Sequence, residues 1–97
     1  MSREKVVIVE DLNLIPVITN HYNFRVMYAL QYFSHPNFIK DYARIQDARM
    51  FDFSLGMLED YKFIERVGAG GYKLTKSGWA ATKYLRSHGF RICKFHS

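Results

Sequence analysis

Apolar residues recur at helical spacing in the segment 23–33. Val26, Met27, Leu30 and Phe33 fall on one stripe of an amphipathic helix. The Ser34-His35-Pro36 sequence ends this helix, and its proline suits the first turn of a second helix. The second helix is short, and its apolar positions are Phe38, Ile39, Tyr42, Ala43 and Ile45.

A third amphipathic helix is predicted from Ala48 to about Tyr61. Asp47 precedes it as the N-cap, because an aspartate side chain accepts hydrogen bonds from the free amides of a first helical turn. The core face recurs at i, i+4 and i+7 and consists of Phe51, Leu55 and Leu58. Gly56 inside this helix costs about 1 kcal/mol relative to alanine. It permits a close approach either to DNA or to another helix, and the second reading is favoured.

The apolar period changes from helical to alternating after the third helix. Residues 63–67 alternate like a strand, the glycine-rich residues 68–71 form a turn, and residues 72–75 form a second strand. Together these segments predict a β-hairpin. A fourth helix follows from Gly78 to about Ser87, with either Thr75 or Ser77 as its N-cap and with Ala81 and Leu85 facing inward.

The segment before residue 20 is harder to assign. Val6 to Val9 is a β-branched run that predicts a short strand or arm, and Leu12 to Ile18, interrupted by Pro16, fits either an extended arm or a short helix. We therefore expect one α+β, mostly helical domain over 1–97, of the winged helix-turn-helix type. Its parts are an N-terminal arm or strand (1–19), a three-helix body (20–62), a hairpin wing (63–75), a fourth helix (76–88) and a basic tail (89–97).

A family resemblance supports this order of elements. Leu55 and Leu58 match the leucine pair that ends the family's recognition helix, and Ile64-Glu65-Arg66 matches its first wing strand. Tyr72-Lys73-Leu74-Thr75-Lys76-Ser77-Gly78 matches its second strand and next helix. Over roughly residues 24–86 the chain resembles small archaeal, bacterial and virus-encoded winged-helix regulators. The resemblance implies that the third helix enters the major groove of duplex DNA, that the hairpin tip approaches the backbone or minor groove, and that two subunits pair.

Charge is distributed unevenly along the chain. Residues 1–60 hold six basic and eight acidic residues, whereas residues 61–97 hold eight basic residues and one acidic residue, Glu65. A one-sided cationic end is typical of a protein that approaches a polyanion, although basic tails also serve solubility alone. The 48% hydrophobic content excludes a disordered chain. We expect a cytoplasmic protein, in the host cytoplasm if virus-encoded, because no signal peptide or membrane span is apparent.

The predicted DNA contacts fall into two chemical classes. The phosphate-binding candidates are Lys40, Arg44, Arg49, Arg66, Lys73 and Lys76. Arg44 and Lys73 are favoured over Arg66, which Glu65 or Asp60 can occupy. Arg49 can also bridge a guanine, and Met50 or Phe53 can touch a thymine methyl. The alternative is that Met50, Phe53 and Met57 are buried under the N-terminal arm or a partner chain.

A homodimer interface is predicted around Trp79, Lys83 and Phe90. Trp79 falls on the outward side of the fourth helix with Lys83, which suggests a contact with a second subunit. The alternative is that the indole packs on the C-terminal tail of its own chain.

Residues for catalysis or metal binding do not form a recognisable set. The four histidines are scattered, and the single cysteine, Cys93, is expected to be an ordinary thiol, although its basic neighbours allow a redox role. We predict no enzyme, no cofactor, no metal, no small-molecule substrate and no membrane contact. The rival functions are a protein-interaction module that uses the apolar face of the third helix, and a ligand-gated regulator with an aromatic pocket between subunits.

Overall fold

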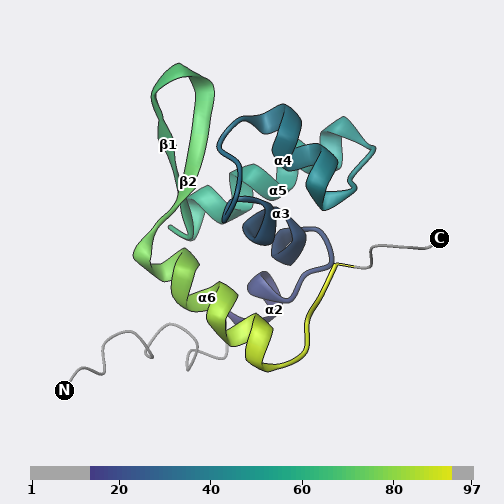
Figure 1. Ribbon diagram of the computed structural model, residues 1–97, viewed down its shortest axis with the longest axis vertical. Coiled ribbons are helices and arrows are strands. Elements are labelled where there is room, and N and C mark those ends of the chain that lie inside the picture. The colour runs from purple at the N-terminus through teal and green to yellow at the C-terminus, as the bar shows by residue number, and fades with distance from the viewer. Residues whose placement is uncertain (1–13, 93–97) are drawn as a thin grey trace.

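Helices dominate the part of the chain that the computed structural model describes, residues 14–92, and one antiparallel hairpin projects from them (Figure 1). The elements in chain order are α2 (Ile15–Ile18), α3 (Asn23–Ala29), α4 (Pro36–Ala43), α5 (Ala48–Asp60), β1 (Ile64–Val67), β2 (Gly71–Leu74) and α6 (Lys76–Ser87). This arrangement makes a small α+β domain, as the sequence predicts.

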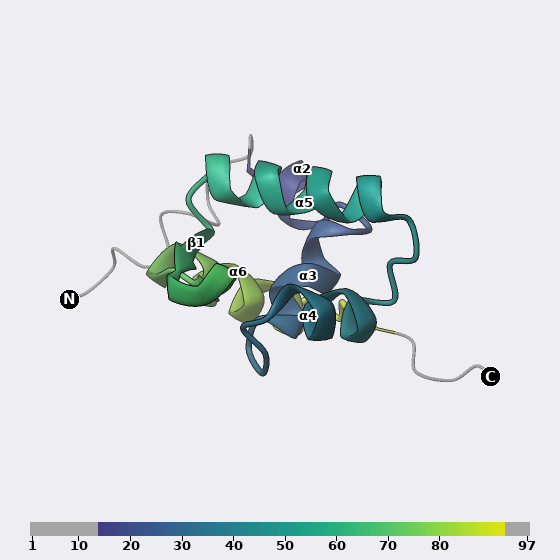
Figure 2. The same ribbon diagram turned by 90° about the horizontal axis from the view of Figure 1, so that it is seen from above.

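The central helix of the domain is α3. It contacts α2, α4, α5 and α6, and of its seven residues only Arg25 is not buried. A helix that is apolar on nearly every side must be covered on every side, and Figure 1 shows α3 enclosed by its neighbours. In the view of Figure 2, α5 forms the upper layer, and α3, α4 and α6 lie together below it.

The first predicted helix is too long by about one turn. The observed helix, α3, ends at Ala29, and residues 31–33 turn away toward the hairpin. As a result Ser34 accepts a hydrogen bond of 2.9 Å from the backbone amide of Tyr72 in β2. Phe33 therefore lies at the surface instead of in the core, and Phe38, predicted to be apolar and inward, is 59% exposed.

The caps of α4 and α5 fix the turn between these two helices. The imidazole of His35 accepts a hydrogen bond from the amide of Asn37 at the start of α4, and Arg44 ends that helix with a left-handed backbone (φ 58°). Asp47 accepts hydrogen bonds from the amides of Arg49 (2.9 Å) and Met50 (3.4 Å). The predicted N-cap of the third helix is thus confirmed, and its core face, Phe51, Leu55 and Leu58, is buried.

The β-hairpin is confirmed and has a tight tip. Ile64 pairs with Leu74 and Val67 with Gly71, and the tip between them is a short turn over Gly68–Gly70. Ala69 (φ 63°) and Gly70 (φ 77°) both adopt left-handed conformations, which explains a glycine at the second of these positions. The loop that contains Ser34 lies along the outer edge of β2, so this edge is partly covered.

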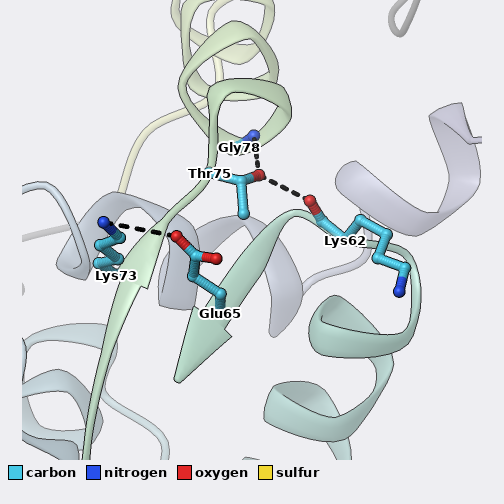
Figure 3. Close-up of polar contacts among 5 residues, drawn as sticks. All are labelled: Lys62, Glu65, Lys73, Thr75 and Gly78. Atoms are coloured by element: carbon cyan, nitrogen blue, oxygen red, sulfur yellow. Dashed lines mark hydrogen bonds and ion pairs between the residues drawn. The ribbon is translucent and has the colours of Figure 1, made fainter. Parts of the chain in front are cut away.

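The junction between the hairpin and α6 is organised by Thr75 (Figure 3). The Thr75 hydroxyl donates a hydrogen bond to the carbonyl of Lys62 (2.6 Å) and accepts one from the amide of Gly78 (3.1 Å). Thr75 and not Ser77 is therefore the N-cap, and α6 begins at Lys76, before the predicted Gly78. The predicted inward residues Ala81 and Leu85 are fully buried.

Both ends of the described chain pack on α3. Residues 15–18 form α2, which resolves the ambiguity in favour of a short helix, and Ile18 is fully buried. Residues 14–19 thus belong to the body and not to an arm. At the other end, the Phe90 ring lies 5.4 Å from that of Phe24, and the Tyr28 hydroxyl donates a hydrogen bond to the Phe90 carbonyl. The predicted strand at 6–9 and Cys93 lie outside the described residues.

Candidate nucleic-acid interface

The outer face of α5 is the predicted recognition surface. It exposes Arg49, Asp52, Phe53, Gly56 and Asp60 to solvent. Phe53 is 64% exposed, so no described residue buries it. A methyl group added at Gly56 would meet no atom of residues 14–92 within 4 Å, so the predicted close approach to another helix is not made within that part of the chain. This face therefore offers one guanidinium, one aromatic ring and two carboxylates.

Met50 and Met57 flank Phe53 but are half-buried. They line a small hollow beside Asn20, Tyr22 and Asn23, in the turn between α2 and α3 and at the start of α3. The sequence left open that Met50, Phe53 and Met57 are buried under the N-terminal arm or a partner chain. Met50 and Met57 are partly buried, but the residues beside them belong to the body of their own chain.

A buried polar network behind this face was not predicted from the sequence. The Ser54 hydroxyl donates to the Asn23 side-chain oxygen (2.6 Å), and the Asn23 amide donates to the Val17 carbonyl (2.9 Å). Both polar side chains are almost fully buried. Buried polar groups stabilise a fold only when they find partners, so this network fixes α5 in one position against α2 and α3. The only signal in the sequence was a serine and an asparagine at otherwise apolar helix positions.

The cations of the hairpin are paired with carboxylates. Arg66 forms an ion pair of 3.0 Å with Glu59 of α5, so the predicted partners Glu65 and Asp60 are wrong. Lys73 lies 3.4 Å from Glu65 on the neighbouring strand (Figure 3). The hydrogen bond to Glu59 raises the pKa of Arg66. Exposed pairs of this kind contribute little to stability, because water competes for both charges.

A second group of predicted cations lies at the turn between α4 and α5. Lys40 is half-buried, and its ammonium group donates to the carbonyl of Gln46 (3.1 Å). Arg44 is exposed in this turn, and Arg49 is exposed in the first turn of α5. The structure thus brings Lys40, Arg44 and Arg49 to the N-terminal end of α5. Arg66 pairs with a residue near the other end of α5, about 20 Å along a helix of this length.

The three predicted dimer residues do not lie together. Trp79 is 50% exposed and shares the outer side of α6 with exposed Lys76 and Lys83. The indole of Trp79 lies outside the hydrophobic core of the described residues. The ring of Phe90 packs against that core, beside Phe24. Trp79 and Lys83 therefore form one surface, and Phe90 belongs to another.

Residues 14–92 hold neither a metal-binding cluster nor a membrane-spanning helix. No group of three histidine, cysteine, aspartate or glutamate side chains in this range lies close enough to hold a metal ion. None of the helices described there has the length and apolar character needed to cross a membrane. Comparison with models of known protein families, with curated proteins and with solved structures finds no match to this chain.

Proposed function

We propose that this chain is a winged helix-turn-helix protein that binds duplex DNA as a transcription regulator. One observation carries the proposal: α4 and α5 are joined by the short turn 44–47, and an antiparallel hairpin packs against the end of α5. The hydrogen bond from Tyr72 to Ser34 supports it further, because the loop before α4 then extends the hairpin edge. In this arrangement α5 enters the major groove and the hairpin lies against the neighbouring backbone.

The proposed phosphate contacts lie at the two ends of α5. Lys40, Arg44 and Arg49 serve the N-terminal end, and Lys73 and Lys76 serve the hairpin side. The pair between Lys73 and Glu65 is exposed, so a phosphate can replace the carboxylate at little free-energy cost. Arg49 is the candidate for a guanine contact, with Phe53 or Met50 against a thymine methyl.

The proposal includes a homodimer and no catalysis. An exposed indole beside lysines on α6 favours contact with a second subunit, and Trp79 is the proposed centre of that contact. Two-fold symmetry then requires half-sites about one helical turn apart. We expect Trp79→Ala to weaken dimerisation in sedimentation-velocity runs over a range of concentrations. An unchanged monomer–dimer distribution would remove Trp79 from the interface.

The decisive experiment is a salt titration of DNA binding by fluorescence anisotropy with a labelled mixed-sequence duplex. If about six cations touch phosphates per dimer, affinity falls roughly 10³-fold between 50 and 200 mM salt. The double variant Lys73→Glu/Lys76→Glu is expected to abolish binding. A negative charge at position 76 suits the first turn of α6, whereas Lys73→Glu sets a second carboxylate opposite Glu65 on the neighbouring strand. Circular dichroism and sedimentation velocity therefore check that the double variant keeps the fold and the dimer.

The matched control is Arg91→Glu, which makes the same charge change at an exposed position after α6, away from α5, the hairpin and the surface around Trp79. It is expected to bind DNA with an affinity within about twofold of wild type, once the dimer is shown to be intact. Binding that does not change with salt, or that survives reversal of Lys73 and Lys76, would refute the proposal.

A second candidate function is a protein-interaction module that uses the outer face of α5. The observation that favours it is the exposed Phe53 with Asp52 and Asp60 on the same side of the helix. Carboxylates repel DNA but suit a basic protein surface. Phe53→Ala separates the two candidates: under the DNA proposal it costs at most one base contact, whereas under the protein proposal it removes the central contact.

A further inference from the structure

A cleft of about 540 Å³ lies on a different side of α3 from α5. Its walls come from α3 and the turn after it, from α4, and from the end of α6 with the segment that follows. Figure 1 shows that segment running from α6 back toward α3 and α4. The volume of the cleft falls within the range of about 300–1,000 Å³ typical of small-molecule sites. None of its lining residues belongs to the outer face of α5 or to the hairpin.

One wall of the cleft is aromatic. Tyr28, Tyr32 and Tyr42 line it, and the rings of Tyr32 and Tyr42 lie 5.6 Å apart. Tyr32 is 63% exposed, so its ring face is accessible to a planar group. Burial raises the pKa of both Tyr28 and Tyr42, in the direction that favours the neutral phenol. Tyrosine faces at such an opening suit stacking with a flat heterocycle.

The other wall is cationic. Arg44, Arg86 and Arg91 line the cleft, and Asp41 is the only acidic residue among its lining residues in the described chain. The guanidinium of Arg86 donates to the side-chain oxygen of Gln31 and lies 5.9 Å from the Tyr28 ring. The lining charges therefore leave an excess of two positive charges. Guanidinium groups are well suited to phosphate because they donate two hydrogen bonds in one plane.

The side chain of Gln31 forms part of the cleft wall beside Arg86. Its nitrogen is buried at the cleft wall and has no acceptor within the part of the chain that the structure describes. The oxygen of the same amide accepts a hydrogen bond from Arg86, so Gln31 helps to hold this guanidinium at the cleft.

We infer that this cleft binds a free nucleoside monophosphate, with the base against Tyr32 and Tyr42 and the phosphate against Arg86 and Arg91. A phosphate monoester carries close to two negative charges at neutral pH, which matches the charge excess of the lining residues. The base matches the aromatic wall formed by Tyr32 and Tyr42. This inference does not depend on DNA binding, because the cleft shares no proposed DNA contact except Arg44.

Isothermal titration calorimetry of the full chain with AMP, GMP, CMP and UMP tests the inference. At least one of the four is expected to bind in a 1:1 ratio with a Kd below about 1 mM. Adenosine and ribose 5-phosphate serve as matched half-ligands for AMP, and the corresponding nucleoside serves for whichever base binds best. Each half-ligand should bind at least about tenfold more weakly, because each lacks one of the two contacts.

Variants then locate the site. Arg91→Gln and Tyr32→Leu change exposed side chains, so the fold is retained, and each is expected to weaken nucleotide binding about tenfold. Lys62→Gln removes the same charge from an exposed side chain outside the cleft and should leave the Kd within about twofold. Circular dichroism spectra and melting temperatures are to be compared with those of the wild type, to check that all three variants are folded.

Three outcomes would overturn the inference. The first is no saturation by any of the four nucleotides up to about 10 mM. The second is nucleotide binding that neither Arg91→Gln nor Tyr32→Leu weakens. The third is tighter binding, per site, of a single-stranded oligonucleotide than of the free nucleotide, since this would assign the cleft to nucleic acid.

Discussion

Replacing either of two helical glycines, Gly78 or Gly56, by alanine should change the free energy of unfolding, but in opposite directions. Gly78 lies in the first turn of α6, directly above the start of the hairpin (Figure 3). A methyl group there would lie 2.1 Å from the carbonyl oxygen of Phe63 and 2.8 Å from a methyl carbon of Leu74. Gly56 is also helical, but a methyl group there meets no atom within 4 Å.

The expected magnitude for Gly78→Ala follows from these distances. An ordinary carbon–oxygen contact is roughly 3.3 Å, so the backbone of α6 or of Phe63 must move by about 1.2 Å. That carbonyl also accepts the backbone amide of Thr75 at 3.0 Å, so the movement breaks this hydrogen bond. Overpacking of about 1–3 kcal/mol and a lost hydrogen bond of about 1 kcal/mol together lower the free energy of unfolding by about 2–4 kcal/mol.

Gly56→Ala should have the reverse effect. Alanine is favoured over glycine in an exposed helix interior by about 1 kcal/mol, because glycine loses more backbone entropy on folding. For a domain of this length this corresponds to a melting temperature about 4–8 °C higher. The assay is urea and thermal unfolding followed by circular dichroism at one fixed protein concentration. Gly78→Ala that is as stable as wild type would refute the packing of α6 on the hairpin described above.

Three further predictions concern side chains that join elements distant in the sequence. Thr75→Ala removes both hydrogen bonds of the threonine hydroxyl and should lower the free energy of unfolding by about 1–2 kcal/mol, whereas Thr75→Ser should recover most of it; chemical denaturation measures both. Ser54→Ala leaves the buried side-chain oxygen of Asn23 without its donor and should destabilise by about 1–3 kcal/mol in the same assay, and a neutral effect would show that the network is unimportant. Burial raises the pKa of Tyr28 above its ordinary value of 10.0, so with rising pH the unfolded chain loses the phenol proton before the folded chain does. The stabilisation of the folded chain is therefore complete below the ordinary pKa and is lost as the pH rises through the pKa of the folded chain. Tyr28→Phe should therefore flatten the decline of the urea midpoint between about pH 9 and 11, and an unaltered decline would assign it to other groups.

The candidate interface could be predicted only in part. Asp47, Arg49 and Phe53 were placed correctly because helical periodicity and capping chemistry are local properties of the chain. The predicted partners of Arg66, Glu65 and Asp60, were wrong because the sequence does not show which acid of α5 faces the hairpin: Glu59 does, whereas Asp60 lies on the outer face. Whether a cation is paired depends on distances that only the folded chain defines.

Local sequence determined the order of the elements, the core face of α5 and the glycine-rich hairpin tip. These features depend on the side-chain period and on backbone preferences within a few residues. Tertiary structure decided the rest. The chain turns after Ala29 because the Ser34 loop lies against β2, and Thr75 caps α6 because its hydroxyl also reaches Lys62.

The cleft with Tyr28, Gln31 and Arg86 also exists only in three dimensions, because its walls come from residues more than fifty positions apart. A sequence pattern shows which faces are apolar. It does not show which distant faces meet, since that depends on how all the helices pack at once.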